Sequence, residues 1–320
     1  MDEWIPKIEL LGKSSDAQLT IAVNYLKAGE YDKALDRIQS ILKIDPKKAE
    51  AHELLGKIYF ERGQLEQAEA SLKSALEYDS EDSRAYWLLS SIYYDKGNLS
   101  EAIEAAEAAV HADPDFVLAH VSLGHYLGIA KEYARARAAY RKALKLNPQL
   151  PVVHRQLGKI YSLEGNTKRA LQELEASLRL EPTNAYAHLA LGDLYYSLGK
   201  RERAILEYRQ TVHFQPHADV ALAKMGDIYF EMERYTEALL EYKRALFVRA
   251  RNTSAHTGVG RIYMKLGQYF EAIQEFEAAL EIDPNLVEAR DGLKEAKEAA
   301  STDENESKPP LLQDNLDNRQ

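Results

Sequence analysis

Histidines are the side chains in this sequence best suited to metal chemistry. The chain of 320 residues contains nine histidines and no cysteine, so a metal site would need imidazole and carboxylate ligands. Five of the histidines are separated by 34 residues or by twice that number: His52, His120, His154, His188 and His256. If each lies on its own helix, neighbouring copies stand about 8–10 Å apart, whereas a zinc–nitrogen bond is about 2 Å long. We therefore expect these histidines to be structural and predict no metal site.

Motifs for catalysis do not accompany the histidines. The sequence has no glycine-rich phosphate loop followed by lysine, no Gly-x-Ser-x-Gly elbow and no His-Glu-x-x-His helix. The formal charge of −10 opposes a general affinity for nucleic acid or for anionic lipid, because both require a basic surface. We expect no enzymatic activity, no cofactor and no nucleic-acid partner.

The histidine spacing belongs to a 34-residue period that runs through most of the chain. Glycine recurs at multiples of 34, at Gly56, Gly124, Gly158, Gly192, Gly226 and Gly260. Alanine follows twelve residues after this place in eight consecutive copies, from Ala34 to Ala272. A second glycine such as Gly63 divides the unit into two helices of about 13 residues. One helix pair cannot bury its own apolar face, so neighbouring pairs must stack.

This period predicts the domain organisation. Eight repeats occupy residues 15–48, 49–82, 83–116, 117–150, 151–184, 185–218, 219–252 and 253–286. Residues 287–300 predict a capping helix with a polar outer face, as the end of a repeat array requires. Residues 1–14 include Trp4 and several aliphatic residues, and we expect them to pack on the first repeat. Residues 301–320 are polar and acidic and are expected to form a disordered tail.

The recurring residues resemble the signature of the tetratricopeptide repeat family. Leu55, Gly56, Tyr59 and Ala68 match the family pattern, and the same places recur in the fifth repeat with Leu157, Gly158, Tyr161 and Ala170. The resemblance implies an all-α fold, a right-handed superhelical α-solenoid of about eight helix-turn-helix repeats with a C-terminal capping helix. It also implies a concave groove lined by the first helix of each pair.

The same resemblance implies a partner-binding site. In the family, the second, fifth, ninth and twelfth residues of a repeat face the groove. The candidates at these places are Lys57, Phe60, Arg84, Trp87, Tyr94, His125, Arg155, Lys159, Tyr186, Leu189, Tyr196 and Phe230. Tryptophan, tyrosine and arginine are the residues that most often dominate binding energy at interfaces.

We expect a peptide or a partner helix to lie along repeats three to six. Trp87, Tyr94 and Tyr186 would hold its apolar side chains. Arg84, Arg155 and Lys159 would hold an acidic group. The alternative for any one of these residues is that it only fills the space between neighbouring first helices. In the fourth repeat, Gly128 leaves out a groove side chain, which could open a pocket or reflect drift in the sequence.

Together these features predict an interaction scaffold or adaptor that binds a protein or peptide in its groove. Two alternatives stay open, a self-assembling structural scaffold and an accessory subunit of a secretion, pilus or envelope-assembly machine. The polar capping helix disfavours end-to-end stacking, so a monomer is favoured. The N-terminus lacks the pattern of a secretory signal, and no apolar run approaches the roughly 20 residues that span a bilayer. The expected location is cytoplasmic.

Overall fold

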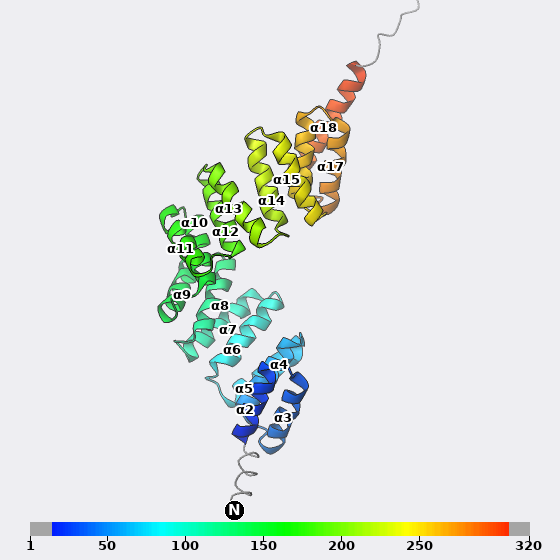
Figure 1. The fold of residues 1–320 in the computed structure, drawn as a ribbon. Helices are drawn as coiled ribbons and strands as arrows, with labels where there is room; N and C mark the ends of the chain where they lie inside the picture. The colour runs from blue at the N-terminus through cyan, green and yellow to red at the C-terminus, as the bar shows by residue number, and fades with distance from the viewer. Residues whose placement is uncertain (1–14, 307–320) are drawn as a thin grey trace, which may run out of the picture. The chain divides into compact units, whose positions relative to one another are not determined.

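In the computed structural model, the described residues 15–306 form α-helices joined by short turns, with no strand among them (Figure 1). The first helices of successive pairs are α2 (Ser15–Lys27), α4 (Ala49–Glu61), α6 (Ser83–Asp95), α8 (Val117–Ile129), α10 (Pro151–Leu163), α12 (Ala185–Ser197), α14 (Asp219–Glu231) and α16 (Thr253–Lys265). The second helices are α3 (Tyr31–Ile44), α5 (Leu65–Tyr78), α7 (Leu99–Ala112), α9 (Tyr133–Leu146), α11 (Thr167–Leu180), α13 (Arg201–Phe214), α15 (Tyr235–Val248) and α17 (Tyr269–Ile282). The closing helix is α18 (Val287–Glu306). The predicted fold class, an all-α solenoid of helix pairs, is confirmed.

The C-terminal helix α18 is longer than the sequence predicted. It begins at Val287, as expected, but continues to Glu306, whereas the sequence predicts an end at residue 300. Ser301 and Thr302 donate their hydroxyl hydrogens to the carbonyl oxygen of Glu298, at 2.8 and 2.9 Å. Extending an existing helix costs far less than starting one, so polar residues can continue it. The expectations for residues 1–14, and for the tail beyond Glu306, lie outside the described residues.

The chain divides into two compact units, which are described separately. Unit 1 comprises residues 1–164 and includes α2 to α10, and unit 2 comprises residues 165–320 and includes α11 to α18. Within each unit, consecutive helices pack side by side, and neighbouring first helices also touch. The alanines of the 34-residue period are fully buried in both units, for example Ala68 in unit 1 and Ala238 in unit 2.

Close packing inside a pair depends on the recurring glycine. A Cβ atom added to Gly124 on α8 would lie 2.7 Å from the ring of Tyr140 on α9, which is too close for any real contact. The ring therefore occupies the space that the missing side chain leaves. Tyr140 is almost completely buried as a result. Each such aromatic contributes about 1.5–3 kcal/mol by its burial.

The turn inside each pair requires a residue with left-handed backbone geometry. Six glycines adopt it, with φ between 70° and 81°: Gly29, Gly63, Gly97, Gly165, Gly199 and Gly267. The fourth and seventh repeats have no glycine at this place, and Lys131 and Glu233 take the same conformation with φ of 62° and 57°. The register of the repeat thus imposes the conformation even where the residue type opposes it.

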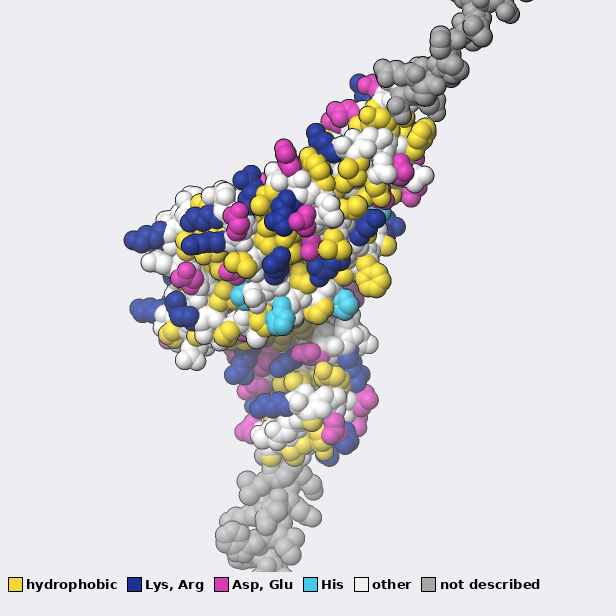
Figure 2. Space-filling view, turned by 45° about the horizontal axis from the view of Figure 1, so that its top comes forward, with side chains coloured by type: hydrophobic (Ala, Val, Ile, Leu, Met, Phe, Trp, Pro, Cys, Tyr) yellow, Lys and Arg dark blue, Asp and Glu magenta, His cyan; other side chains and the backbone are white. Residues whose placement is uncertain are grey.

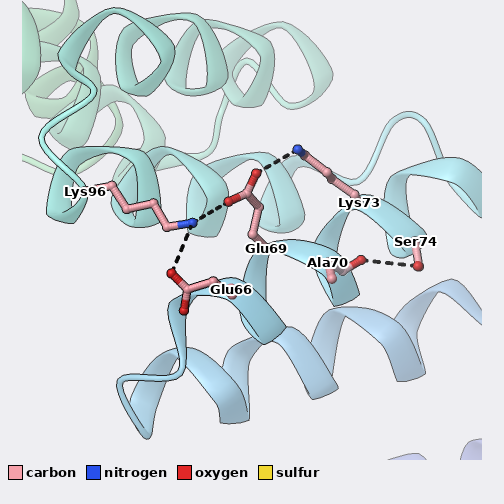
Figure 3. Close-up of polar contacts among 6 residues, drawn as sticks. All are labelled: Glu66, Glu69, Ala70, Lys73, Ser74 and Lys96. Atoms are coloured by element: carbon pink, nitrogen blue, oxygen red, sulfur yellow. Dashed lines mark hydrogen bonds and ion pairs between the residues drawn. The ribbon is translucent and has the colours of Figure 1, made fainter.

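Ion pairs join neighbouring repeats at one recurring place. Lys96, which follows α6, lies 2.6 Å from Glu69 of α5, and Glu69 also binds Lys73 of its own helix at 2.7 Å (Figure 3). Glu164 and Arg137 pair at the equivalent place with the charges exchanged. Lys96 and Glu69 are partly buried, with 24% and 20% of their side chains exposed, so water screens this contact somewhat less than a fully exposed pair.

The five recurring histidines hold the turns between repeats. In each, Nε2 donates a hydrogen bond to the backbone carbonyl oxygen six residues earlier, at 2.9–3.3 Å. His120 is buried and makes this bond to Pro114. In His188 and His256, Nδ1 also lies 2.7 Å from the carboxylate of Glu207 or Glu275. The regular spacing of these histidines therefore has a structural cause.

The outer surface carries charges of both signs. On the face drawn in Figure 2, basic, acidic and apolar side chains of the described residues are interspersed. Such mixing is typical of a soluble surface and does not itself mark a binding site. The cavities between the helices differ more clearly from one another in charge and in apolar character.

Candidate functional site

The first helices of unit 1 enclose a cavity that we call the N-terminal pocket. It lies between α2, α4 and α6 and has a volume of about 560 Å³. Its apolar walls include Leu19, Val23 and Leu26 of α2, Trp87 of α6, and Phe116 and Leu118 at the start of α8. Lys57 and Arg84, two of the predicted groove residues, also line it. The pocket therefore combines an apolar interior with charged groups.

Trp87 both stabilises the helix packing and faces this pocket. Its Nε1 donates a hydrogen bond to Oγ of Ser122 on α8 at 3.0 Å. Its ring meets Phe116 edge to face, with ring centroids 5.8 Å apart. The packing alternative considered for the groove residues thus holds for part of the Trp87 side chain, while its remaining surface lines the cavity.

Glu53 is the buried acid of the N-terminal pocket. Only 9% of the residue is exposed, although it lines the cavity. Burial raises the pKa of this carboxyl group to about 7; Asp82 adds to the effect, and Arg84 and Lys57 oppose it. A carboxyl group in this environment exchanges its proton near neutral pH.

Two smaller cavities lie at the other end of unit 1, around α8, α9 and α10. We call them the α8–α10 pockets, and their volumes are about 210 and 300 Å³. Both are lined by His125, Tyr140 and Gln156; Lys159 borders one and Arg155 the other. Their lining residues, all within the described part of unit 1, include no aspartate or glutamate. These pockets therefore favour an anion.

The aromatic residue Tyr94 lies beside the same region. Its ring stacks on Tyr126 at a centroid distance of 5.0 Å and meets the His125 ring edge to face at 5.5 Å. Burial lowers the pKa of His125, and the positive charges of Arg155 and Lys159 lower it further. At neutral pH, His125 is a neutral ring that offers hydrogen bonds beside two permanent cations.

Gly128 opens the smaller of these pockets. It lines the cavity of about 210 Å³, and a Cβ atom added to it would meet no atom within 4 Å. The helix packing therefore does not require glycine here, unlike at Gly124. Gly128 is interpreted from the sequence either as opening a pocket or as drift, and the open space beside it agrees with the pocket.

The predicted residues of unit 2 form a different surface. Tyr186 is 59% exposed on α12, whereas Leu189 packs against the core. The Tyr196 hydroxyl donates a hydrogen bond to Glu231, and Phe230 packs under Arg261, with the guanidinium carbon 4.2 Å from the ring centre. These contacts link neighbouring first helices of the unit.

The groove acids of unit 2 have partners within the unit. Asp193 accepts a hydrogen bond from the Tyr208 hydroxyl at 2.8 Å and lies 3.0 Å from Nζ of Lys224. Asp227 accepts a hydrogen bond from the Tyr242 hydroxyl at 2.7 Å. The groove acids of unit 2 thus have partners within the unit, whereas no aspartate or glutamate lines the α8–α10 pockets of unit 1.

No group of three or more metal-ligating side chains comes together in the part of the chain that the structure describes. Among those residues, no helix is both long enough and apolar enough to cross a membrane.

Comparison with known proteins decides the family. One model of the tetratricopeptide repeat matches residues 19–71, 54–116, 93–151 and 223–287, and a second matches residues 162–228. The chain is a tetratricopeptide repeat (TPR) protein. No curated protein sequence matches it.

Several solved structures resemble this TPR protein. The APC/C hetero-tetramer Cut9–Hcn1 matches with 22% identity and a TM-score of 0.63, over 92% of this chain and 58% of that one. A TPR protein from Parabacteroides merdae matches with 19% identity and a TM-score of 0.62, over 78% and 98%. Pseudomonas aeruginosa pilF matches with 23% identity and a TM-score of 0.57, over 63% and 92%. Our chain thus spans little more than half of the Cut9–Hcn1 match, and at these identities the likeness shows the fold alone.

The structure of this TPR protein also adds residues that the sequence did not select. Tyr140 lies on a second helix and reaches both α8–α10 pockets past Gly124. Phe116 belongs to the turn before α8 and closes the N-terminal pocket. Glu53 stands at a groove place of the second repeat, so its position could be predicted, but its burial could not. Phe60, which was selected, packs against the core between repeats two and three.

Proposed function

We propose that this TPR protein is an interaction scaffold whose unit 1 binds an acidic segment of a partner protein along its first helices. The observation that carries the proposal is the composition of the α8–α10 pockets. They join apolar walls, such as Val121 and Ile129, to Arg155, Lys159 and His125, and no acid lines them in the described unit. An aspartate or glutamate flanked by apolar residues is the ligand that best complements this lining.

Charge-assisted hydrogen bonds would position the segment. Arginine can hold a carboxylate through two parallel N–H donors, whereas lysine attracts it as a point charge. Lys159 is exposed and can reach a ligand without rearrangement of the helix. Tyr94 adds a partly exposed ring beside His125. Tyrosine and arginine are among the residue types that most often dominate binding energy.

The assignment to unit 1 rests on a contrast with unit 2. Asp193 and Asp227 would repel an acidic segment in unit 2, and Lys224 is already paired with Asp193. The cavity next to α18 is bordered by the acids Glu288, Asp291 and Glu295 and by the cations Arg261 and Lys265. An acidic segment is therefore favoured in unit 1, and the two units are proposed to bind different partners or different parts of one partner.

The proposal can be tested with a library of displayed random peptides selected on the full chain. Peptides enriched on the wild type should combine aspartate or glutamate with leucine, isoleucine or phenylalanine. The Lys159→Glu variant should lose this enrichment, because it reverses the charge that borders the pocket. Lys145→Glu is the matched control, since Lys145 is exposed on the second helix α9 and does not line these pockets.

The same selection can contradict the proposal. Enrichment of basic peptides, or acidic peptides retained equally by Lys159→Glu, would show that the α8–α10 pockets are not the binding site. Circular dichroism of each variant must first show unchanged helix content, so that loss of binding reflects the surface and not the fold.

A further inference from the structure

The N-terminal pocket contains a buried acid that the proposed function has not used. Glu53 is 9% exposed and lines a cavity of about 560 Å³. Among the described residues, no hydrogen bond or ion pair to its carboxyl group is found. Burial of a carboxyl group favours its protonated form, which can donate a hydrogen bond. Glu53 therefore presents a largely buried carboxyl group to the cavity.

The charged groups around Glu53 are three cations and two acids. Those that line the cavity or act on Glu53 are Lys27 of α2, Glu50 and Lys57 of α4, Arg84 of α6 and Asp82 at the N-terminal end of α6; α8 contributes only apolar residues. Asp82 is already used, because it accepts hydrogen bonds from the backbone N–H groups of Arg84 and Ala85. Glu50 lies 3.6 Å from Lys48. The three cations have no such partner among the described residues.

We infer that the N-terminal pocket holds an acidic side chain of the bound segment and that Glu53 takes up a proton from solvent when it does so. The inference rests on the proposed function and adds a second contact and a pH dependence to it. Lys57 and Arg84 attract the incoming carboxylate, whereas an ionised Glu53 would repel it. The protonated Glu53 instead donates its O–H to the ligand carboxylate, which satisfies the buried group.

The position of Glu53 sets the pH at which this exchange occurs. Because burial raises its pKa to about 7, the free protein is partly protonated near neutral pH. The ligand's negative charge raises the pKa of Glu53 further in the complex. Affinity is then highest below pH 7. It falls as the pH rises, because a smaller fraction of Glu53 is protonated in the free protein and binding requires the protonated form. A basic ligand would show the opposite dependence, because it requires ionised Glu53.

The fluorescence of Trp87 reports binding directly, because this residue lines the same pocket. The chain has two tryptophans, so Trp4→Phe leaves Trp87 as the single indole. In this background, an N-acetylated octapeptide of alternating leucine and aspartate is titrated between pH 6.5 and 8.5, where its carboxylates stay ionised and His125 stays mostly neutral. The Kd is expected to rise with pH, approaching tenfold per pH unit above 7.5. Glu53→Gln, which mimics the protonated acid, should give a Kd that does not change with pH.

Two further measurements keep the test decisive. Glu61→Gln is the matched control on the same helix, because Glu61 is exposed and does not line the pocket, and it should retain the wild-type pH dependence. Calorimetry of the unmutated protein in two buffers of different ionisation enthalpy should show uptake of up to about three quarters of a proton at pH 7.5, because a group of pKa about 7 already holds about a quarter of a proton at that pH. This measurement needs no Glu53 variant. A pH dependence that survives Glu53→Gln, or no proton uptake, would overturn the inference.

Other outcomes separate this inference from the proposed function. If the peptide binds with one Kd at all pH values and Lys159→Glu weakens it, the scaffold proposal stands and the inference about Glu53 is wrong. If the lysine counterpart of the peptide binds more tightly than the aspartate peptide, both are wrong.

Discussion

Tyr242 of α15 donates a hydrogen bond from its hydroxyl to Oδ1 of Asp227 on α14, at 2.7 Å. Its ring fills the space above Gly226, where an added Cβ atom would lie 2.6 Å from the ring. Tyr242 thus fills the space between the two helices with its ring and holds Asp227 in position on the groove side with its hydroxyl group. Tyr208 and Asp193 form the same hydrogen bond one repeat earlier in unit 2, at 2.8 Å.

Removing this hydroxyl should destabilise unit 2 in a pH-dependent way. Burial raises the pKa of Asp227, and the hydrogen bond from Tyr242 partly opposes that rise. A raised pKa means that stability is fully present below the unfolded pKa, about 3.9, and is lost as the pH rises through the folded pKa. Tyr242→Phe should therefore lower the free energy of unfolding by about 1–2 kcal/mol at pH 7 and by less at pH 4.5. Urea unfolding at both pH values measures this.

The control for this prediction is Tyr263→Phe. Tyr263 is partly buried in the same unit, and its hydroxyl makes no hydrogen bond among the described residues. An equal loss of stability in both variants would show that the Tyr242 hydroxyl contributes nothing specific.

Two glycines of the helices should respond in opposite ways to alanine. Gly226→Ala places a methyl group against the Tyr242 ring, and we expect a loss of about 1–2 kcal/mol of stability, since overpacking outweighs the gain in helix propensity. Gly128→Ala meets open space and should gain about 0.5–1 kcal/mol. Denaturant midpoints of the two variants test the pair, and a stabilising Gly226→Ala would contradict the packing argument.

The two left-handed residues that are not glycine offer a route to stabilisation. Lys131 and Glu233 have φ of 62° and 57°, a conformation that costs an L-residue about 1–2 kcal/mol. Lys131→Gly and Glu233→Gly should each raise the free energy of unfolding by about 0.5–1 kcal/mol, after the larger chain entropy of glycine is allowed for. Gly97→Ala, at φ of 81°, should lower it by a similar amount. Thermal unfolding of the three variants distinguishes these directions.

The histidine–glutamate pairs should make unit 2 more stable at mildly acidic pH. The hydrogen bond from His256 to Glu275 raises the pKa of His256 above its usual value. The stabilisation is therefore fully present below the unfolded pKa, about 6.5, and is lost as the pH rises through the folded value. Glu275→Gln should cost roughly 1 kcal/mol at pH 5.5 and much less at pH 8.5. Glu281→Gln on the same helix, exposed and without an ion pair among the described residues, should show no such difference.

The α8–α10 pockets show where prediction from sequence stopped. Lys159 and Arg155 could be placed on the groove side from their position in the repeat, and both line a pocket. Tyr140 could not, because it reaches the pocket from a second helix through the space beside Gly124. Trp87 was selected as a ligand contact, yet its hydrogen bond to Ser122 also ties α6 to α8. Contacts that a side chain makes with a neighbouring helix cannot be predicted from the face of its own helix alone.

The sequence by itself determined the helix pairs, their register and their stacking. A 34-residue period is a local and repeated constraint, since small residues must recur wherever helices approach and a left-handed residue wherever a pair turns. Even the conformation of Lys131 follows from its place in that register. Only the tertiary structure decided that Glu53 is buried beside a cavity that Lys27, Lys57 and Arg84 also line. Burial and electrostatic environment depend on side chains from α2, α4, α6 and α8 together, and no single repeat encodes their sum.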